Sequence, residues 1–472
     1  MNIKAMSFIK NMSYTISSNL ITLIISTLGI LVIPKLLGVE DYGYWQLYLF
    51  YASYVGFLHF GWTDGIYLRY GGDEYNELDK KLFFSQFVML FSSQIFIGIF
   101  MCFFTSIFIS DLNRGFIITM VSISMIIVNI RIMLIYILQA TNRIKEYARV
   151  TMSDRVAFII LVIVFLLAGI RDYKVIILAD LLGKLFSLIY SMVSCRDIVF
   201  NRISYFYLTI NETTKNIGVG IKLMFANIAS MLIIGVVRFG IELKWNMETF
   251  GKVSLTLSIS NLLMVFINAV GIIIFPVLRR TNEDKLPLIY STMKTFLMVP
   301  LLGLLVGYYP LKIILSVWLP QYTESLMYMA LLFPMCVYEG KMALLINTYL
   351  KTLRKEKLIL KINLVSVMLS ITLTILFTLV IGDLTLAILS IVALLAFRSA
   401  LAEVFLSRIL NVSVYKDLLL EIAITLIFIL TGWFLTWWIG AVLYLVAYSL
   451  YLVIKKKDIT DTLKIVKQLI RE

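Results

Sequence analysis

Five cationic side chains lie inside stretches of the chain that are otherwise apolar enough to span a bilayer. They are Arg131, Lys184, Arg238, Lys341 and Arg398. A charge near the bilayer centre costs roughly 2.5–3.5 kcal/mol on insertion scales, so five of them facing lipid would cost on the order of 10 kcal/mol. We therefore expect these side chains to face a water-filled cavity. A cavity with more buried positive than negative charge suits an anionic ligand.

Two of the cations have a carboxylate one turn away on the same predicted helix face. Asp180 precedes Lys184, and Glu242 follows Arg238. Side chains four residues apart are neighbours on a helix surface. Internal ion pairing is therefore the alternative to ligand binding for these two cations.

The other three cations lack such a partner. Glu339 is only two residues from Lys341, which places the two on different helix faces. Arg398 has Glu403 a little further along its span, and Arg131 has no carboxylate in its own span. Arg131 is therefore the first choice for a cation that binds ligand, followed by Lys341 and Arg398.

His59 is the only histidine of the chain, and Asp64 follows it within the same predicted span. A histidine can carry a coupling proton because its pKa lies near neutrality, and packing within a helix is the alternative role. The three cysteines, which are Cys102, Cys195 and Cys336, are scattered and have no metal-ligand spacing. We expect neither a metal site nor a cofactor.

The composition indicates an all-α, polytopic membrane protein. Hydrophobic residues make up 61% of the 472 residues, charged residues 15%, and the mean hydropathy is +0.94. Soluble domains have about 45–50% apolar and about 25% charged residues. No polar stretch is long enough to form a soluble domain, and no small-residue cleavage site follows the first apolar run.

The hydropathy pattern predicts about fourteen transmembrane helices, since a helical span needs about 20 apolar residues. The predicted spans cover residues 12–33, 44–67, 83–109, 116–138, 156–170, 175–194, 217–241, 252–275, 289–308, 325–349, 358–381, 384–406, 418–436 and 438–454.

The distribution of Lys and Arg predicts the orientation. With the N-terminus in the cytoplasm, the inner segments carry 30 of the 42 Lys and Arg residues, the outer segments 7, and the spans the 5 cations named above. Cytoplasmic loops are enriched in Lys and Arg. We therefore expect both termini in the cytoplasm and an even number of spans. The net charge of +14 follows from this topology and does not indicate nucleic-acid binding.

A weak internal repeat suggests two six-helix lobes. Glu40-Asp41-Tyr42-Gly43 and Glu248-Thr249-Phe250-Gly251 share the pattern Glu-x-aromatic-Gly, and both precede a span six spans apart. An even spacing predicts a parallel repeat about an axis along the membrane normal, with a central cavity between the lobes. The expected division is residues 1–200 for the first lobe, 201–410 for the second, and 411–472 for two additional helices with a basic cytoplasmic tail.

Several motifs resemble those of the Wzx-type polysaccharide flippases, which export O-antigen or capsule repeat units and belong to the MOP superfamily with the MATE exporters and lipid II flippases. The resemblance rests on residues 33–45 (IPKLLGVEDYGYW), 60–65 (FGWTDG) leading to Arg69-Tyr70, 139–148 (QATNRIKEYA) and 220–227 (GIKLMFAN). It extends over the first twelve predicted spans.

The resemblance implies a function. Such proteins move undecaprenyl-diphosphate-linked oligosaccharide repeat units from the cytoplasmic to the outer leaflet by alternating access through a cationic lumen. The protein would be a transporter and no enzyme, located in the bacterial cytoplasmic (inner) membrane. Its partners would be the lipid-linked glycan, the bilayer, and the polymerase and chain-length proteins of the same pathway. Lipid II flippases have arginines in spans one and two, which the predicted spans here lack.

Two alternatives to a flippase remain. The first is a MATE-like secondary antiporter of small molecules, which would need buried acids to dominate the lumen. The second, less favoured, is a membrane polysaccharide polymerase, which would need a larger outer loop than residues 309–324 provide. The coupling ion is open among a proton, sodium and the membrane potential.

Overall fold

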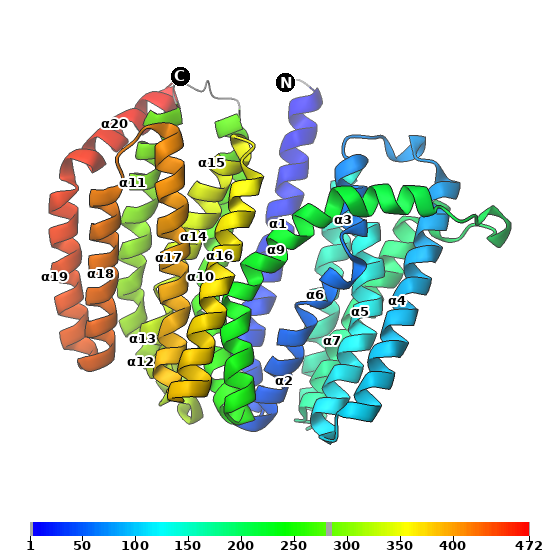
Figure 1. Ribbon diagram of the computed structural model, residues 1–472, viewed down its shortest axis with the longest axis horizontal. Helices are drawn as coiled ribbons and strands as arrows, with labels where there is room; N and C mark the ends of the chain where they lie inside the picture. Colours follow the sequence, from blue (N-terminus) through cyan, green and yellow to red (C-terminus); the bar gives the residue numbers. More distant parts are fainter. Residues whose placement is uncertain (1–2, 280–285, 472) are drawn as a thin grey trace. The chain divides into compact units, whose positions relative to one another are not determined.

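The computed structural model describes the backbone of residues 3–279 and 286–471 and the side chains of residues 20–262, 264 and 286–464. Every regular element in these ranges is helical (Figure 1). The chain forms two compact units, Met1–Ile228 and Ala229–Glu472, and the boundary lies within α9 (Ile210–Lys244). Residues 411–472 belong to this second unit, whereas the sequence-based division treats them as a separate part.

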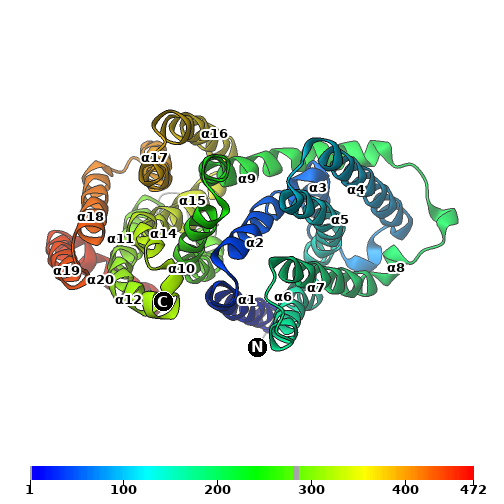
Figure 2. The ribbon, with the colours of Figure 1, turned by 90° about the horizontal axis from the view of Figure 1, so that it is seen from below.

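The first unit is built around α5. This helix packs against α2, η1, α3, α4 and α7. Helix α6 packs against α1 and α7. Figure 2 shows these helices viewed roughly along their axes. The elements of this unit are α1 (Ile3–Leu36), α2 (Val39–Ala52), η1 (Val55–His59), α3 (Trp62–Arg69), η2 (Tyr75–Glu77), α4 (Lys80–Phe108), α5 (Leu112–Ala140), α6 (Ile144–Leu167), α7 (Tyr173–Ser194), α8 (Arg196–Val199), η3 (Ile203–Tyr205) and the first part of α9.

Aspartates fix the starts of three helices in this unit. The carboxylates of Asp79, Asp111 and Asp172 accept backbone N–H groups at the starts of α4, α5 and α7. Such N-caps satisfy donors that have no partner within the helix. The outward faces of the long helices remain apolar. Phe96 of α4, for example, is 73% exposed, as expected for a side chain that contacts lipid.

The second predicted span, residues 44–67, is not one helix. It consists of α2, η1 and α3, and the break lies at Phe60 and Gly61, whose φ angles are 54° and 79°. Glycine is needed at position 61 because a Cβ there would lie 2.5 Å from the backbone nitrogen of Ile221 in α9. The break therefore brings α3 against the first part of α9.

The second unit consists mainly of long helices packed around α14 and α17. In it, α16 packs on α17, α18 on α19, and α20 on α11. Its elements are the remainder of α9, α10 (Met247–Arg279), α11 (Leu286–Leu304), η5 (Leu305–Gly307), α12 (Tyr308–Trp318), η6 (Pro320–Tyr322), η7 (Ser325–Tyr328), α13 (Met329–Leu332), α14 (Met335–Gly340), the π-helix η8 (Lys341–Ile346), α15 (Asn347–Thr352), α16 (Glu356–Thr374), the π-helix η9 (Ile375–Ile381), α17 (Leu384–Leu410), α18 (Tyr415–Phe434), α19 (Trp437–Ile454) and α20 (Lys456–Arg471).

The structure is that of a polytopic membrane protein. Within the described residues, eleven helices are long and apolar enough to cross a membrane, and Leu20–Leu36 is a shorter apolar helix. The predicted span 252–275 lies in α10, and the short predicted span 156–170 belongs to the longer α6. The count of fourteen and the parallel repeat stay predictions.

Candidate functional site

Lys184 is held within the first unit by groups from three helices. Its Nζ lies 2.6 Å from Asp180 Oδ2 on the same face of α7. It also donates to the hydroxyls of Tyr48 in α2 at 3.3 Å and Ser124 in α5 at 3.2 Å. The Tyr48 hydroxyl donates to Asp180 Oδ2 at 2.7 Å. Lys184 is therefore part of a compact polar cluster, and Asp180 takes the pairing role that the helix spacing indicates.

Arg131 contacts a carboxylate that its own span does not supply. Its Nη1 lies 2.6 Å from Asp154 Oδ2 in α6 and donates to Ser187 Oγ in α7 at 3.2 Å. Gly183 permits this close approach of α6 and α7, because a Cβ there would lie 2.9 Å from the backbone oxygen of Asp154. The side chain of Arg131 stays 13% exposed, so it is less enclosed than Lys341 or Arg398.

His59 and Asp64 face each other across the break between η1 and α3. His59 Nδ1 accepts the backbone N–H of Gly61 at 3.1 Å, so the neutral imidazole carries its proton on Nε2. That Nε2 lies 3.7 Å from Asp64 Oδ2, and both residues are buried. His59 and Asp64 are therefore a buried pair of titratable side chains at the break.

In the second unit, Arg398 on α17 is almost completely buried and fully engaged. Its Nη1 donates to Glu339 Oε1 on α14 at 3.0 Å, its Nε to Asn363 on α16 at 3.0 Å, and its Nη2 to Ser230 on α9 at 2.9 Å. Glu339 therefore pairs with Arg398 on the facing helix α17. It does not pair with Lys341, which is two residues away in sequence.

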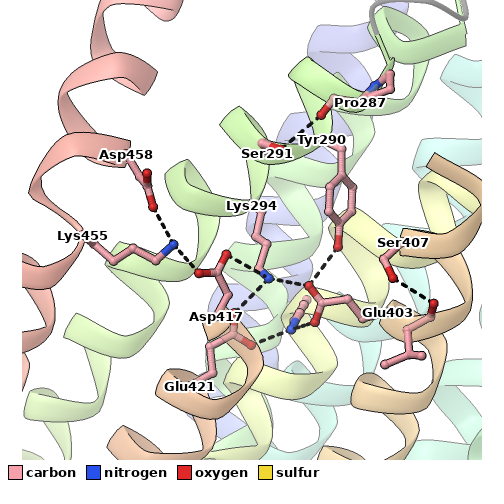
Figure 3. Close-up of polar contacts among 12 residues, drawn as sticks. Pro287, Tyr290, Ser291, Lys294, Glu403, Ser407, Asp417, Glu421, Lys455 and Asp458 are labelled. Carbon is pink, nitrogen blue, oxygen red and sulfur yellow. Dashed lines mark hydrogen bonds and ion pairs between the residues drawn. The ribbon is translucent and has the colours of Figure 1, made fainter. Parts of the chain in front are cut away.

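Lys341 lies between two glutamates at the start of the π-helix η8. Its Nζ is 2.5 Å from Glu421 Oε2 on α18 and also forms an ion pair with Glu403 on α17. A second lysine, Lys294 on α11, lies 2.6 Å from Glu403 Oε1 and 3.7 Å from Glu421 Oε1. The hydroxyl of Tyr290 donates to Glu403 at 2.9 Å (Figure 3).

This network continues from the buried glutamates to the surface of the second unit. Lys294 is 3.2 Å from Asp417 Oδ2, and Lys455 is 2.5 Å from Asp417 Oδ1 and 2.7 Å from Asp458 Oδ2 (Figure 3). Burial lowers the pKa of Lys455, whereas its contacts with Asp417 and Asp458 raise it. The second effect is larger, so the pKa of Lys455 lies above its ordinary value. Lys455 therefore stays charged.

Arg238, the last of the five predicted cations, lies on α9. Its Nη2 donates to Ser254 Oγ on α10 at 3.1 Å, and its guanidinium lies 5.4 Å from the ring centre of Phe250. Glu242, one turn further along α9, is buried. The pairing of Arg238 with Glu242 stays a prediction.

These contacts change the expected charge balance of the spans. In the described part of the chain, four of the five predicted cations contact a carboxylate. Four of these carboxylates, which are Asp154, Glu339, Glu403 and Glu421, lie on a different helix from the cation. Buried acids therefore offset the buried cations more fully than the sequence suggests. Lys294 is not among the five predicted cations, because it lies close to the inner end of the predicted span 289–308.

The comparisons with known proteins give no match by sequence. No family model matches the chain, and no curated protein matches it.

Solved structures match the chain in fold. A structure described as "Lipid II flippase MurJ, inward closed conformation" has a TM-score of 0.65 and 14% identity, and the match covers 96% of this chain and 100% of the other. An inward-facing multidrug resistance MATE family transporter of the MOP superfamily has a TM-score of 0.62 and 10% identity, with 83% of this chain and 98% of the other covered. The chain has the fold of the MOP-superfamily transporters.

Proposed function

We propose that this protein is a flippase for undecaprenyl-diphosphate-linked oligosaccharide repeat units in the bacterial cytoplasmic membrane. The observation that carries this proposal is the extent of the structural match. The lipid II flippase structure matches 96% of this chain, whereas the MATE transporter matches 83%. A match over nearly the whole of both chains favours transport of a lipid-linked glycan over export of a small molecule. The motifs shared with Wzx-type flippases favour an oligosaccharide as the cargo.

The lack of arginine in the second predicted span does not exclude a peptidoglycan precursor as the cargo. The second predicted span has no arginine, but α3 extends to Arg69, whose Nη2 lies 2.6 Å from Glu212. The choice of an oligosaccharide repeat unit therefore rests on the Wzx-like motifs.

In this proposal, the buried cations bind the diphosphate by exchanging partners. Arg131 is the first candidate because its side chain is partly exposed and its guanidinium has further N–H groups that can form a bidentate contact with phosphate. Lys184, Arg238, Lys341 and Arg398 are the remaining proposed lumen cations. The carboxylate partners of Lys184, Lys341 and Arg398 hold these three side chains in place until the anionic headgroup competes for the same N–H groups.

The coupling ion in this proposal is a proton. The His59–Asp64 pair provides a buried titratable contact at a helix break, where a change of charge can alter the backbone. Asp180 and Glu339 are pairing carboxylates for Lys184 and Arg398, and alternating access requires these pairs to exchange or separate.

A MATE-like secondary antiporter is the second candidate function. The near-equal TM-scores of the two structural matches favour it, and so does the number of buried carboxylates in the spans. A polymerase has no comparable support, and we propose a transporter and not an enzyme.

The test is deletion of the gene in its host, followed by analysis of lipid-linked intermediates in each leaflet. We expect single repeat units on undecaprenyl diphosphate to accumulate on the inner leaflet and surface polysaccharide to be lost. Accumulation of single units on the outer leaflet would instead indicate a polymerase. Normal surface polysaccharide with increased sensitivity to small toxic cations would indicate an antiporter.

A further inference from the structure

The ion pairs of the second unit form a continuous path from the surface to the buried glutamates. Positive and negative groups alternate along it, and neighbouring oxygen and nitrogen atoms are at most 3.7 Å apart. The side chains of Asp458 and Asp417 are 52% and 22% exposed, whereas those of Lys294 and Glu421 are 5% and 2% exposed. The path runs through Asp458, Lys455, Asp417, Lys294, Glu421 and Lys341.

The two buried glutamates are stabilised unequally. Glu403 forms ion pairs with Lys294, at 2.6 Å, and with Lys341, and it accepts a hydrogen bond from the Tyr290 hydroxyl at 2.9 Å. Glu421 has Lys341 at 2.5 Å, which it shares with Glu403, and reaches Lys294 only at 3.7 Å. Because both carboxylates are fully buried, the one with fewer close partners is the one whose negative charge is harder to keep.

We propose that Glu421 is a proton-binding site that is loaded from the surface of the second unit through Asp417 and Lys294. The titratable and charged groups near it lie on α18 itself and on neighbouring elements of the second unit. They are Tyr290 and Lys294 of α11, Tyr338 of α14, Lys341 of η8, Glu403 of α17, Asp417 of α18, Tyr451 of α19 and Lys455 at its end.

The transfer moves one proton and leaves Lys294 unchanged. A proton from water first binds Asp417. The ammonium of Lys294 then moves toward Glu421, whose Oε1 lies 3.7 Å from its Nζ, and gives one of its protons to that oxygen. It takes the proton of Asp417 from Oδ2, so that Asp417 returns to its carboxylate form. Glu421 is now neutral. Its contact with Lys341 changes from an ion pair to an ordinary hydrogen bond, which loosens α18 from η8.

Two features distinguish this arrangement from a static tie between helices. Buried ion pairs contribute little to stability compared with apolar packing of the same volume, so a merely structural role does not account for so extended a network. Lys341, at the inner end of the path, is also the first residue of the π-helix η8, and π-helical turns occur frequently at functional sites. Use of the site for coupling rests on the proposed transport function, whereas proton binding itself does not.

The experiment is infrared titration of the purified full-length protein in lipid membranes. We expect a carboxylic-acid C=O band to appear as the pH falls, to be lost in Glu421→Gln, and to persist in Glu339→Gln. Glu339 is the matched control because it is also ion-paired within the second unit but has no contact with this path in the described residues. Asp417→Asn should keep the band and slow its appearance after a pH jump.

A second measurement uses the wild-type chain and does not depend on a folded variant. A hydrophobic carbodiimide reacts with protonated buried carboxyl groups, and mass spectrometry locates the adduct. We expect labelling of Glu421 that increases on acidification, with Glu403 unmodified. An unchanged infrared band in Glu421→Gln, or equal labelling of the two glutamates, would overturn the proposal. Neither readout depends on which substrate the protein transports, so its failure is distinct from failure of the proposed function.

Discussion

Arg131 and Asp154 depend on each other because both are largely withdrawn from water. Loss of one partner of a buried ion pair costs about 3–5 kcal/mol, since the other charge is left unpaired. Asp154 is only 7% exposed, and Arg131 is the cation that the structure places beside it. An effect of an Arg131 substitution on export therefore has to be separated from an effect on folding.

Arg131→Ala should lower both export and the amount of protein in the membrane, whereas Arg131→Lys should keep the protein and part of its export. The double variant Arg131→Met/Asp154→Asn should restore the amount but not export, because the cation for the diphosphate is still missing. Surface polysaccharide plotted against membrane abundance measures both effects. Normal export by the double variant would remove Arg131 from the proposed binding site.

Lys184 provides the comparison, because its carboxylate partner Asp180 lies on its own helix and it also contacts Tyr48 and Ser124. Lys184→Met should lower protein abundance. Lys184→Met/Asp180→Asn should recover abundance but not export, because Lys184 is also a proposed lumen cation. Export that recovers together with abundance would remove Lys184 from the proposed binding site.

The spacing within one helix could predict some of these contacts but not others. Asp180 and Lys184 are one turn apart, so their pairing is readable from the sequence. Asp154 and Glu421 come from neighbouring helices, and their contacts depend on helix packing that no local spacing encodes. Lys294 lies five residues inside the predicted span 289–308, and this position within an apolar run is the signal that it is buried.

At the scale of elements, α3 and the first part of α9 approach each other backbone to backbone. A Cβ on Gly65 would lie 1.9 Å from the backbone oxygen of Asn216, and one on Gly220 would lie 2.0 Å from that of Gly61. Arg69 donates to Asn216 Oδ1 at 2.5 Å and secures the same contact. Small residues are what permit such close packing of helices in membranes.

Gly65→Ala should therefore force α3 and α9 apart and reduce thermal stability. Adding a side chain to a tightly packed contact typically costs about 1–3 kcal/mol, and here the obstructing atom belongs to the backbone, which cannot rotate away. Thermal unfolding of the purified protein measures the effect. We also expect export to fall, because α9 continues into the second unit.

Gly218→Ala is the control for this substitution. It lies on α9 close to Gly220, but a Cβ at Gly218 has no atom within 4 Å. Alanine favours a helix over glycine by about 1 kcal/mol, so Gly218→Ala should leave stability unchanged or raise it slightly. Equal destabilisation by the two variants would mean that α3 and α9 are not in close contact.

The break in the second span and the terminal helix α20 mark the limits of prediction for elements. Hydropathy gives a continuous span because Phe60 and Trp62 flank Gly61, and it does not register the left-handed backbone at the break. Three glycines and His59 within ten residues were a signal for irregular structure.

The α20 sequence has Ile459 and Leu463 one turn apart among charged residues. This pattern predicts an amphipathic helix and not only a basic tail.

At the scale of the whole molecule, hydrophobic composition and span length predicted the class of fold, because the bilayer admits few alternatives to helices. The extents of the two compact units could not be predicted in this way. Their boundary lies inside the continuous helix α9 and not in a polar linker, so no change of composition marks it. The placement of Lys and Arg is independent of this packing and predicts the orientation of the chain.

The orientation can be tested by cysteine accessibility in a variant without Cys102, Cys195 and Cys336. Cysteines at Gly38 and Asp383 should react with an impermeant thiol reagent added to intact cells. Both positions are exposed at the ends of helices, and a Cβ at Gly38 meets no atom within 4 Å. Asn113, at the same predicted side, is half-buried beside Tyr173 and should react more slowly.

Cysteines at Asn76 and Asn142 should react only after the membrane is permeabilised. Both residues are exposed and lie in segments predicted to be cytoplasmic; Asn282, the third predicted inner position, lies outside the described residues. The reason is the surplus of Lys and Arg on this side, 30 against 7, which resists translocation. Labelling of Asn142 from outside would reverse the orientation. It would also place Asp417, where the proton enters the path to Glu421, on the outer side of the membrane, because Asp417 lies in the last predicted inner loop, residues 407–417.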